Sequence, residues 1–226
     1  MSEFIFMLTK NDATIRDAFE VYEEVRKTSL EYIGFKDIGL PFDQLKKLTE
    51  LIHSDGRPAM LEVVSEKKED ELCSAQAAVE LGVDYLLGGT HAEEVTTMLK
   101  GTNIKYFPFA GQVVGHPSKL RGTIPEIADS ARRLSRMQGV HGVNLLAYRF
   151  EGDVPALIEA VVSAIDVPLI VAGSIDSTSR LQTVLNTGAW AFTVGSAIFD
   201  YKYIDHAVQE QVLNILNRIP KERMEA

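Results

Sequence analysis

Two glycine-serine pairs follow neighbouring apolar segments in the last third of the chain. Gly173 and Ser174 come directly after PLIVA, and Gly195 and Ser196 come directly after AWAFTV. Glycine lets the backbone approach a ligand closely, and small side chains leave the main-chain N–H groups exposed. A short helix starting at Ser196 would direct its positive end toward the same place. The combination suits a phosphate monoester, with the two serine hydroxyls as further donors.

A second set of residues could transfer protons. Glu62 lies in the apolar segment MLEVV, where a buried carboxylate is costly unless a cation pairs with it. Lys36, directly after YIGF, or Lys10, after FIFML, could supply that cation. A lysine–glutamate pair can move a proton next to a carbonyl group, with Asp12 or Asp37 orienting it. The alternative is a structural ion pair that closes the interior.

Lys36 keeps several roles open. It shares the strand parity of Tyr32 and Gly34, and adjacent side chains on a strand point to opposite faces, so only one of Lys36 and Asp37 can face the interior. An interior lysine could be a base, a Schiff-base nucleophile or a clamp for the substrate. The alternative is a solvated loop lysine.

Four residues are candidates for other contacts with the substrate, and Lys10, already named, is one of them. His91 ends the segment GGTH, and His116 lies in the irregular stretch GQVVGHPSKLRG, where it could cover an anionic substrate together with nearby basic residues. Arg149 could hold an anionic group with two hydrogen bonds, or could pair with Glu151 or Asp153. His116 could also belong to an ordinary solvated loop.

A metal site is not expected. His91 and His116 could join Asp37 or Asp176 as ligands, but no HxH or HxxxH spacing supports such a site. We therefore predict no metal and no cofactor, although FMN carries the same phosphate group as the predicted ligand.

These residues need a scaffold that brings their segments together. Apolar segments typical of strands alternate with amphipathic helical segments along the whole chain. Several are apolar nearly throughout, as in parallel strands that are covered by helices on one face and packed inside on the other. The predicted strands are 4–8, 32–35, 59–64, 84–88, 105–109, 142–147, 168–172 and 191–195.

Eight such units in 226 residues predict an α/β protein, a single (β/α)8 TIM barrel over residues 1–226. An open doubly wound sheet is the main alternative, but no GxGxxG turn follows the first strand. The stretch 111–122 is predicted to be a loop over one barrel face. In a barrel the carboxyl ends of all strands face one side, so the turns after the seventh and eighth strands converge.

Composition limits the partners. The net charge of −9 argues against nucleic acid or an anionic membrane as a partner, since both favour a basic surface. The single cysteine, Cys73, excludes an intrachain disulfide and fits a reducing cytoplasm. MSEFIFMLTK is too short an apolar segment for a signal peptide, and no segment is long enough to span a membrane. A homodimer is compatible with the sequence, because dimers are the commonest closed homo-oligomers.

The segment VAGSIDSTSRLQTVLNTGAWAFTVGSAIF, 171–199, resembles the closing segment of the phosphate-binding barrel superfamily. That superfamily of ribulose-phosphate binding barrels includes ribulose-phosphate epimerase, N-acylmannosamine-6-phosphate epimerase, two histidine-biosynthesis barrels, and thiamine-phosphate and thiazole synthases. The resemblance implies that Gly173 and Ser174 form one phosphate turn and that Gly195 and Ser196 form the other. It covers about the last third of the chain.

The family within the superfamily stays open. The segments opened by Pro58 and Pro168 echo each other about half a chain apart, which favours the histidine-biosynthesis barrels or reflects the general likeness of such units. The histidine-biosynthesis barrels have paired aspartates at the ends of the first and fifth strands. In this chain Asp12 lies near the first of these positions, but the fifth strand ends in FPFAG, which contains no aspartate. No DxKxxD motif is present, and no Schiff-base lysine follows the sixth strand.

The sequence and the resemblance together predict an enzyme that binds a sugar phosphate and isomerises or epimerises it by proton transfer next to a carbonyl. Two alternatives keep the same phosphate site. One is a Schiff-base aldolase or synthase that uses Lys36. The other is a non-catalytic barrel that senses a phosphorylated metabolite, as the glycerol-phosphate antiterminator barrels do.

Overall fold

The structure is a computed structural model that describes residues 2–63, 65, 67–115 and 117–220. Eight parallel strands form one sheet in the order β10-β11-β12-β1-β4-β5-β6-β7. Their bounds are β1 (Glu3–Met7), β4 (Tyr32–Lys36), β5 (Ala59–Glu62), β6 (Tyr85–Leu87), β7 (Lys105–Phe107), β10 (Val143–Leu145), β11 (Leu169–Val171) and β12 (Ala191–Val194).

The two edges of this sheet meet. Asn144 of β10 forms a parallel bridge with Phe109. The Asn144 N–H donates to the Pro108 carbonyl at 2.8 Å, and the Asn144 carbonyl accepts from the Ala110 N–H at 2.9 Å. The sheet therefore closes into a barrel. The predicted (β/α)8 barrel is confirmed and the open-sheet alternative is excluded.

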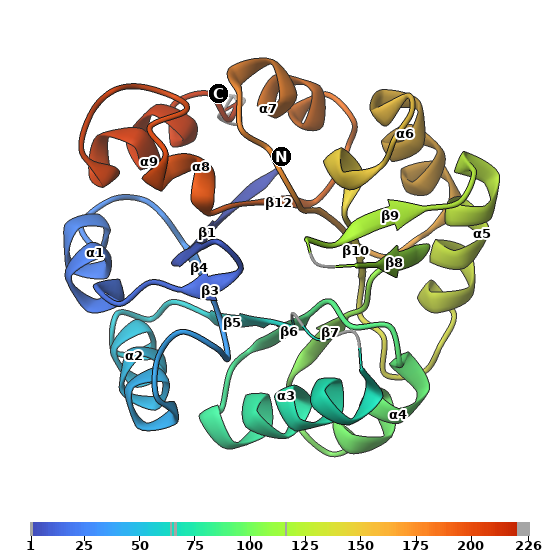
Figure 1. Cartoon of the computed structure of the whole chain (residues 1–226), viewed down its shortest axis with the longest axis horizontal. Helices are drawn as coiled ribbons and strands as arrows, with labels where there is room; N and C mark the ends of the chain where they lie inside the picture. The colour runs from blue at the N-terminus through green and yellow to red at the C-terminus, as the bar shows by residue number, and fades with distance from the viewer. Residues whose placement is uncertain (1, 64, 66, 116, 221–226) are drawn as a thin grey trace, which may run out of the picture.

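Helices surround the strands as a ring (Figure 1). They are α1 (Ala18–Val25), α2 (Phe42–Ser54), α3 (Lys68–Leu81), α4 (Ala92–Met98), α5 (Ile124–Ser135), α6 (Val154–Ala164), α7 (Thr178–Leu185), α8 (Ser196–Phe199) and α9 (Val208–Leu216), with a 3-10 turn η1 (Ala147–Arg149). Outward strand residues such as Phe6, Phe35 and Leu61 belong to the buried cluster between strands and helices. Inward residues such as Ile5, Met60 and Ile170 form a second cluster inside the barrel.

The register of the strands decides which residues share the interior. Met7 pairs with Gly34, and Lys36 pairs with Glu62, in the parallel ladders β1–β4 and β4–β5. A Cβ on Gly34 would lie 2.2 Å from Met7 Sδ, so the glycine makes room for the methionine inside the barrel. Residues in register point to the same face, which brings Lys36 and Glu62 side by side at the carboxyl ends of their strands.

Two antiparallel hairpins depart from the sequence prediction. The loop expected over 111–122 contains the hairpin β8 (Gln112–Val114)–β9 (Lys119–Arg121), beside α5 and α6 (Figure 1). Its inward Leu120 is 2% exposed, and this burial orders the segment. The hairpin β2 (Thr9–Lys10)–β3 (Ala13–Thr14), directly after β1, was not predicted because its strands are only two residues long.

Among the described residues, no helix has both the length and the apolar character needed to cross a bilayer.

Candidate functional site

A cavity of about 280 Å³ opens at the carboxyl ends of the strands. Its wall includes both glycine-serine pairs as well as Lys36. The structure therefore brings the two predicted phosphate turns and the predicted proton-transfer residues into one hollow. A volume of this size suits a small metabolite.

The turn after β11 adopts a left-handed backbone. Gly173 has a φ of +80° and Ser174 a φ of +55°, a region that glycine enters freely and other residues enter rarely. Within the described part of the chain, the N–H groups of both residues donate to no other group. They remain available to an anion in the cavity.

The turn after β12 needs glycine for a different reason. Gly195 has a negative φ, but a Cβ there would lie 2.7 Å from Thr9 Oγ1 and 2.9 Å from the Thr9 carbonyl oxygen. Close packing against the β2–β3 hairpin thus excludes a side chain. A short helix begins at Ser196, as predicted, and the N–H groups of Gly195 and Ser196 donate to no other described residue.

A lysine flanked by two carboxylates lies at the end of β4, which only β1 separates from β12 in the sheet. Lys36 Nζ is 2.9 Å from Asp12 Oδ1 and 3.3 Å from Glu62 Oε2. Lys36 is 7% exposed and Glu62 is 9% exposed. Burial lowers the pKa of Lys36, but the charges and hydrogen bonds of Glu62 and Asp12 outweigh burial, and the net shift is upward. Lys36 is therefore an ammonium ion at neutral pH, and the two carboxylates are the groups that can accept a proton.

The unpredicted β2–β3 hairpin explains how Asp12 reaches Lys36. Asn11 and Asp12 are the two central residues of its turn, with φ values of +51° and +60°. Positive φ at both positions is typical of a type I′ hairpin. Thr14 Oγ1 fixes the hairpin to β4, because it donates to the Lys36 carbonyl at 2.7 Å and accepts from the Lys36 N–H at 2.8 Å.

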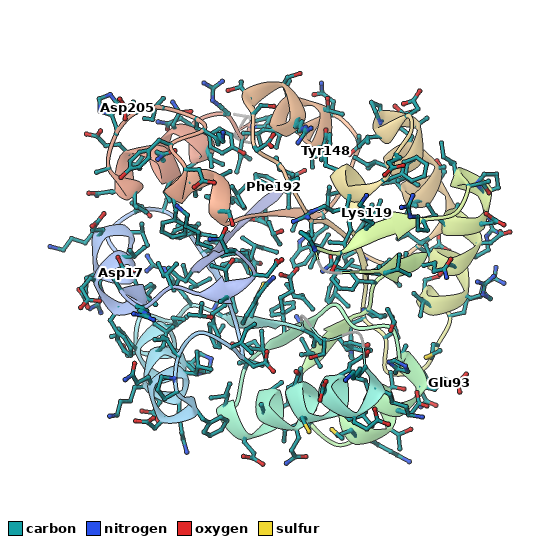
Figure 2. The ribbon with its side chains drawn as sticks, viewed as in Figure 1. Asp17, Glu93, Lys119, Tyr148, Phe192 and Asp205 are labelled. Atoms are coloured by element: carbon teal, nitrogen blue, oxygen red, sulfur yellow. The ribbon has the colours of Figure 1, made fainter. Side chains whose placement is uncertain are left out.

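Arg149 lies on the cavity wall next to the first turn. A Cβ on Gly173 would lie 3.0 Å from Arg149 Cγ, so the arginine side chain packs over the glycine. The two ion pairs considered for Arg149 do not form. Glu151 lies 3.5 Å from Lys119 Nζ of β9 (Figure 2), and Asp153 instead caps α6. Within the described residues, the Arg149 guanidinium has no carboxylate partner.

Lys10 and Asp37 point away from Lys36. Lys10 Nζ lies 2.8 Å from Asp200 Oδ1, and both side chains are exposed at the rim. Asp37 accepts a hydrogen bond from Ser74 of α3, because it follows Lys36 and has the opposite parity. Neither Lys10 nor Asp37 is part of the described cavity wall.

His91 is also held outside the cavity wall. Its Nδ1 lies 2.7 Å from Glu71 Oε2, and the same carboxylate accepts the N–H groups of Thr90 at 2.9 Å and His91 at 3.0 Å. Glu71 is fully buried in α3 and ties the β6–α4 turn to that helix. His116 lies outside the described residues.

Thr193 and Lys202 are among the cavity residues that sequence reasoning missed. Thr193 points inward because it pairs in register with Ile5, and its position two residues before Gly195 was the available signal. Lys202 lies on the rim after α8, and it has no ion pair among the described residues. No pattern in the segment DYKY distinguishes this lysine from an ordinary surface residue.

No known family model matches the chain, and no curated protein matches its sequence. Solved structures do match its fold. Orotidine 5′-phosphate decarboxylase from Pyrococcus horikoshii OT3 has a TM-score of 0.69 at 13% identity, covering 96% of this chain and 98% of that one. N-(5′-phosphoribosyl)anthranilate isomerase from Pyrococcus furiosus has a TM-score of 0.63 at 17% identity, with coverages of 96% and 100%.

N-acetylmannosamine-6-phosphate 2-epimerase from Clostridium perfringens has a TM-score of 0.64 at 11% identity, covering 96% of this chain and 93% of that one. Identities this low show a shared fold and no more. The chain therefore shares the (β/α)8 barrel fold of these three enzymes, the fold that its alternating strand and helix segments predicted.

Proposed function

We propose that this protein is an enzyme that binds a small phosphorylated metabolite and isomerises or epimerises it by proton transfer next to a carbonyl. One observation carries the proposal: a single small cavity holds both glycine-serine turns and the Lys36–Asp12–Glu62 cluster. Enzymes named for phosphorylated substrates share the fold, among them an isomerase and an epimerase. Their names support a phosphorylated substrate and a reaction of this kind for this chain.

The phosphate would bind between the two turns. Four N–H groups, from Gly173, Ser174, Gly195 and Ser196, lack partners among the described residues, and successive free N–H groups form a concave site for anions. Arg149 adds a guanidinium beside the first turn, which can bind two phosphate oxygens at once. These local donors offset the acidic net charge of the chain.

The Lys36 cluster would carry out the chemistry. Glu62 or Asp12 removes the proton from the carbon next to the carbonyl, and the C–H electron pair moves to form an enediolate. The Lys36 ammonium stabilises the oxyanion. An epimer forms when the other carboxylate of the pair, protonated before the reaction, donates its proton to the opposite face of the same carbon, so that the two carboxylates exchange protonation states. Return of the abstracted proton to the former carbonyl carbon instead, with a proton moving between the two oxygens, gives an isomer.

The Schiff-base alternative is less well supported. A lysine must be neutral to attack a carbonyl carbon, whereas Glu62 and Asp12 raise the pKa of Lys36 despite its burial. Borohydride treatment in the presence of substrate separates the two mechanisms, because only a Schiff base is trapped as a stable adduct.

Thermal stabilisation by inorganic phosphate and a panel of three- to six-carbon sugar phosphates tests the proposal. A ligand at a hundredfold excess over its Kd stabilises by ~2.7 kcal/mol, or roughly 5–10 °C for a chain of this size. Ser174→Asp places a carboxylate in the cavity at a backbone conformation that aspartate tolerates. Ser179→Asp, on the exposed first turn of α7, is the matched control.

We expect the stabilisation in the wild type and in Ser179→Asp, and its loss in Ser174→Asp. The best sugar phosphate is then incubated with enzyme in D₂O, where NMR detects deuterium uptake next to the carbonyl. Binding without exchange or turnover indicates a sensing barrel instead of an enzyme. Absence of stabilisation by every phosphate refutes the phosphate site.

A further inference from the structure

Two carbonyl groups of the loop after β11 are held by side chains from outside the cavity. The Ser174 carbonyl accepts a hydrogen bond from Arg180 Nη1 at 2.7 Å. The next carbonyl, that of Ile175, accepts from the Tyr203 hydroxyl at 2.6 Å. Ser174 and Ile175 line the cavity, whereas Arg180 and Tyr203 are not part of its described wall.

Arg180 is itself fixed in place. Its Nη1 also donates to Asp176 Oδ1 at 2.8 Å, and its guanidinium carbon lies 4.9 Å from the centre of the Tyr148 ring. The Tyr148 hydroxyl donates to the Arg180 carbonyl at 3.1 Å. These contacts leave Arg180 Nη1 facing the loop. They also give Asp176, a residue of the cavity wall, a positive partner.

The Tyr203 hydroxyl keeps its proton and can therefore donate a hydrogen bond. Burial first, and the charge of Asp176 second, raise its pKa well above the ordinary tyrosine value. The hydroxyl is therefore protonated, and able to donate, at neutral pH.

Fixing a carbonyl also fixes the N–H group that follows it. The peptide unit is planar and trans, so its C=O and N–H point in opposite directions. When the Ser174 carbonyl faces Arg180, the Ile175 N–H faces away from Arg180. When the Ile175 carbonyl faces Tyr203, the Asp176 N–H faces away from Tyr203. Neither N–H donates to another described residue.

We propose that Arg180 and Tyr203 are positioning residues for the phosphate site, which direct the N–H groups of Ile175 and Asp176 into the cavity as phosphate donors. The inference rests on the proposed function and extends it, because the phosphate turn then continues past Gly173 and Ser174. Arg180 has a second effect: it neutralises the Asp176 carboxylate, which would otherwise repel the phosphate.

Two variants test this assignment in the full chain. Tyr203→Phe keeps the ring and removes only the hydroxyl. Its matched control is Tyr22→Phe, which removes a hydroxyl that bonds Asp55 Oδ2 at 2.7 Å, a contact between α1 and the end of α2. Arg180→Met removes the hydrogen bond to the Ser174 carbonyl and the positive partner of the Asp176 carboxylate. Its control is Arg132→Met, which breaks a surface ion pair with Asp129 within α5.

Calorimetric titration with inorganic phosphate gives the affinity. We expect Tyr203→Phe to weaken it roughly three- to tenfold, as for one lost hydrogen bond, and Arg180→Met to weaken it at least about tenfold. Arg180→Lys should recover part of the loss, because one nitrogen makes both contacts. Tyr22→Phe should lower thermal stability without changing phosphate affinity.

Amide NMR of the wild type observes the two donors directly. The amide proton signals of Ile175 and Asp176 should move downfield as phosphate is added. If phosphate binds while these signals stay in place, or if both Arg180→Met and Tyr203→Phe bind it as tightly as the wild type, the assignment is overturned and the proposed function stands. If the wild type binds neither phosphate nor any sugar phosphate, both this assignment and the proposed function are refuted.

Discussion

Replacing Lys36 by methionine removes the positive charge at the centre of the candidate site and keeps a side chain of similar length. The change leaves Glu62, which is 9% exposed, without the ammonium 3.3 Å away. A buried carboxylate without a cation is costly, because no water replaces the lost partner. Asp12 loses the same partner, but its side chain is 28% exposed.

The size of the effect follows from these burials. Removing one partner of a buried ion pair destabilises a protein by ~3–5 kcal/mol. The contribution of Asp12 is reduced by solvent screening. We therefore expect Lys36→Met to lower the free energy of unfolding by about 3 kcal/mol, or roughly 6–12 °C in the thermal midpoint.

Urea denaturation of four proteins measures this: the wild type, Lys36→Met, Glu62→Gln, and the double variant. If the pair is buried and coupled, Glu62→Gln costs much less in the Lys36→Met background than in the wild type, with a coupling energy of about 1–3 kcal/mol. A Lys36→Met variant within about 0.5 kcal/mol of the wild type, or strictly additive substitutions, would refute the buried cluster.

The pH dependence provides a second check with a definite sign. The folded-state pKa of Lys36 is raised, so its stabilising contribution is complete below the unfolded-state pKa and is lost as the pH rises through the folded value. The unfolded value for lysine is about 10.4. The difference in stability between the wild type and Lys36→Met should therefore stay constant from pH 7 to about 9, and should shrink only above about pH 10.

Three other substitutions have definite expectations. Glu62→Gln should lower kcat roughly 10²- to 10⁴-fold, as for a lost general base, while calorimetry shows unchanged phosphate affinity. Gly195→Ala should destabilise by about 1–3 kcal/mol in urea, since its Cβ would lie 2.7 Å from Thr9 Oγ1; an unchanged midpoint contradicts the packing. Asn144→Leu should stabilise by about 1–3 kcal/mol, because both amide atoms are buried without partners in the described chain; destabilisation would reveal a bound partner.

The barrel was predictable because strand periodicity and strand ends are local properties. All eight predicted strands correspond to barrel strands. Strand parity allowed only one of Lys36 and Asp37 to face the interior, and the structure places Lys36 there because β4 extends to this residue. A cation beside Glu62 was predicted because a carboxylate inside an apolar strand needs one, but the sequence left Lys10 and Lys36 as alternatives, and the structure selects Lys36.

Other features depend on contacts that sequence spacing does not encode. His91 was expected at the functional rim, but Glu71 of α3 binds its ring and its N–H group. Glu71 lies in an acidic segment, KEDELC, that resembles a solvated helix start, so nothing local indicates its full burial. Arg180 and Tyr203 were missed for the same reason: their partners are carbonyl groups, which every residue carries.

The β2–β3 hairpin links the two halves of the candidate site. Its turn carries Asp12 to Lys36, while Thr9 packs directly on Gly195 and the Asn11 N–H donates to Ser196 Oγ at 3.3 Å. The second glycine-serine turn and the Asp12 carboxylate are therefore both in contact with one short, tightly turned segment. A side chain at position 195 would displace the hairpin, and Asp12 would move with it. Glycine at this position thus sets the geometry of the lysine cluster as well as that of the glycine-serine turn.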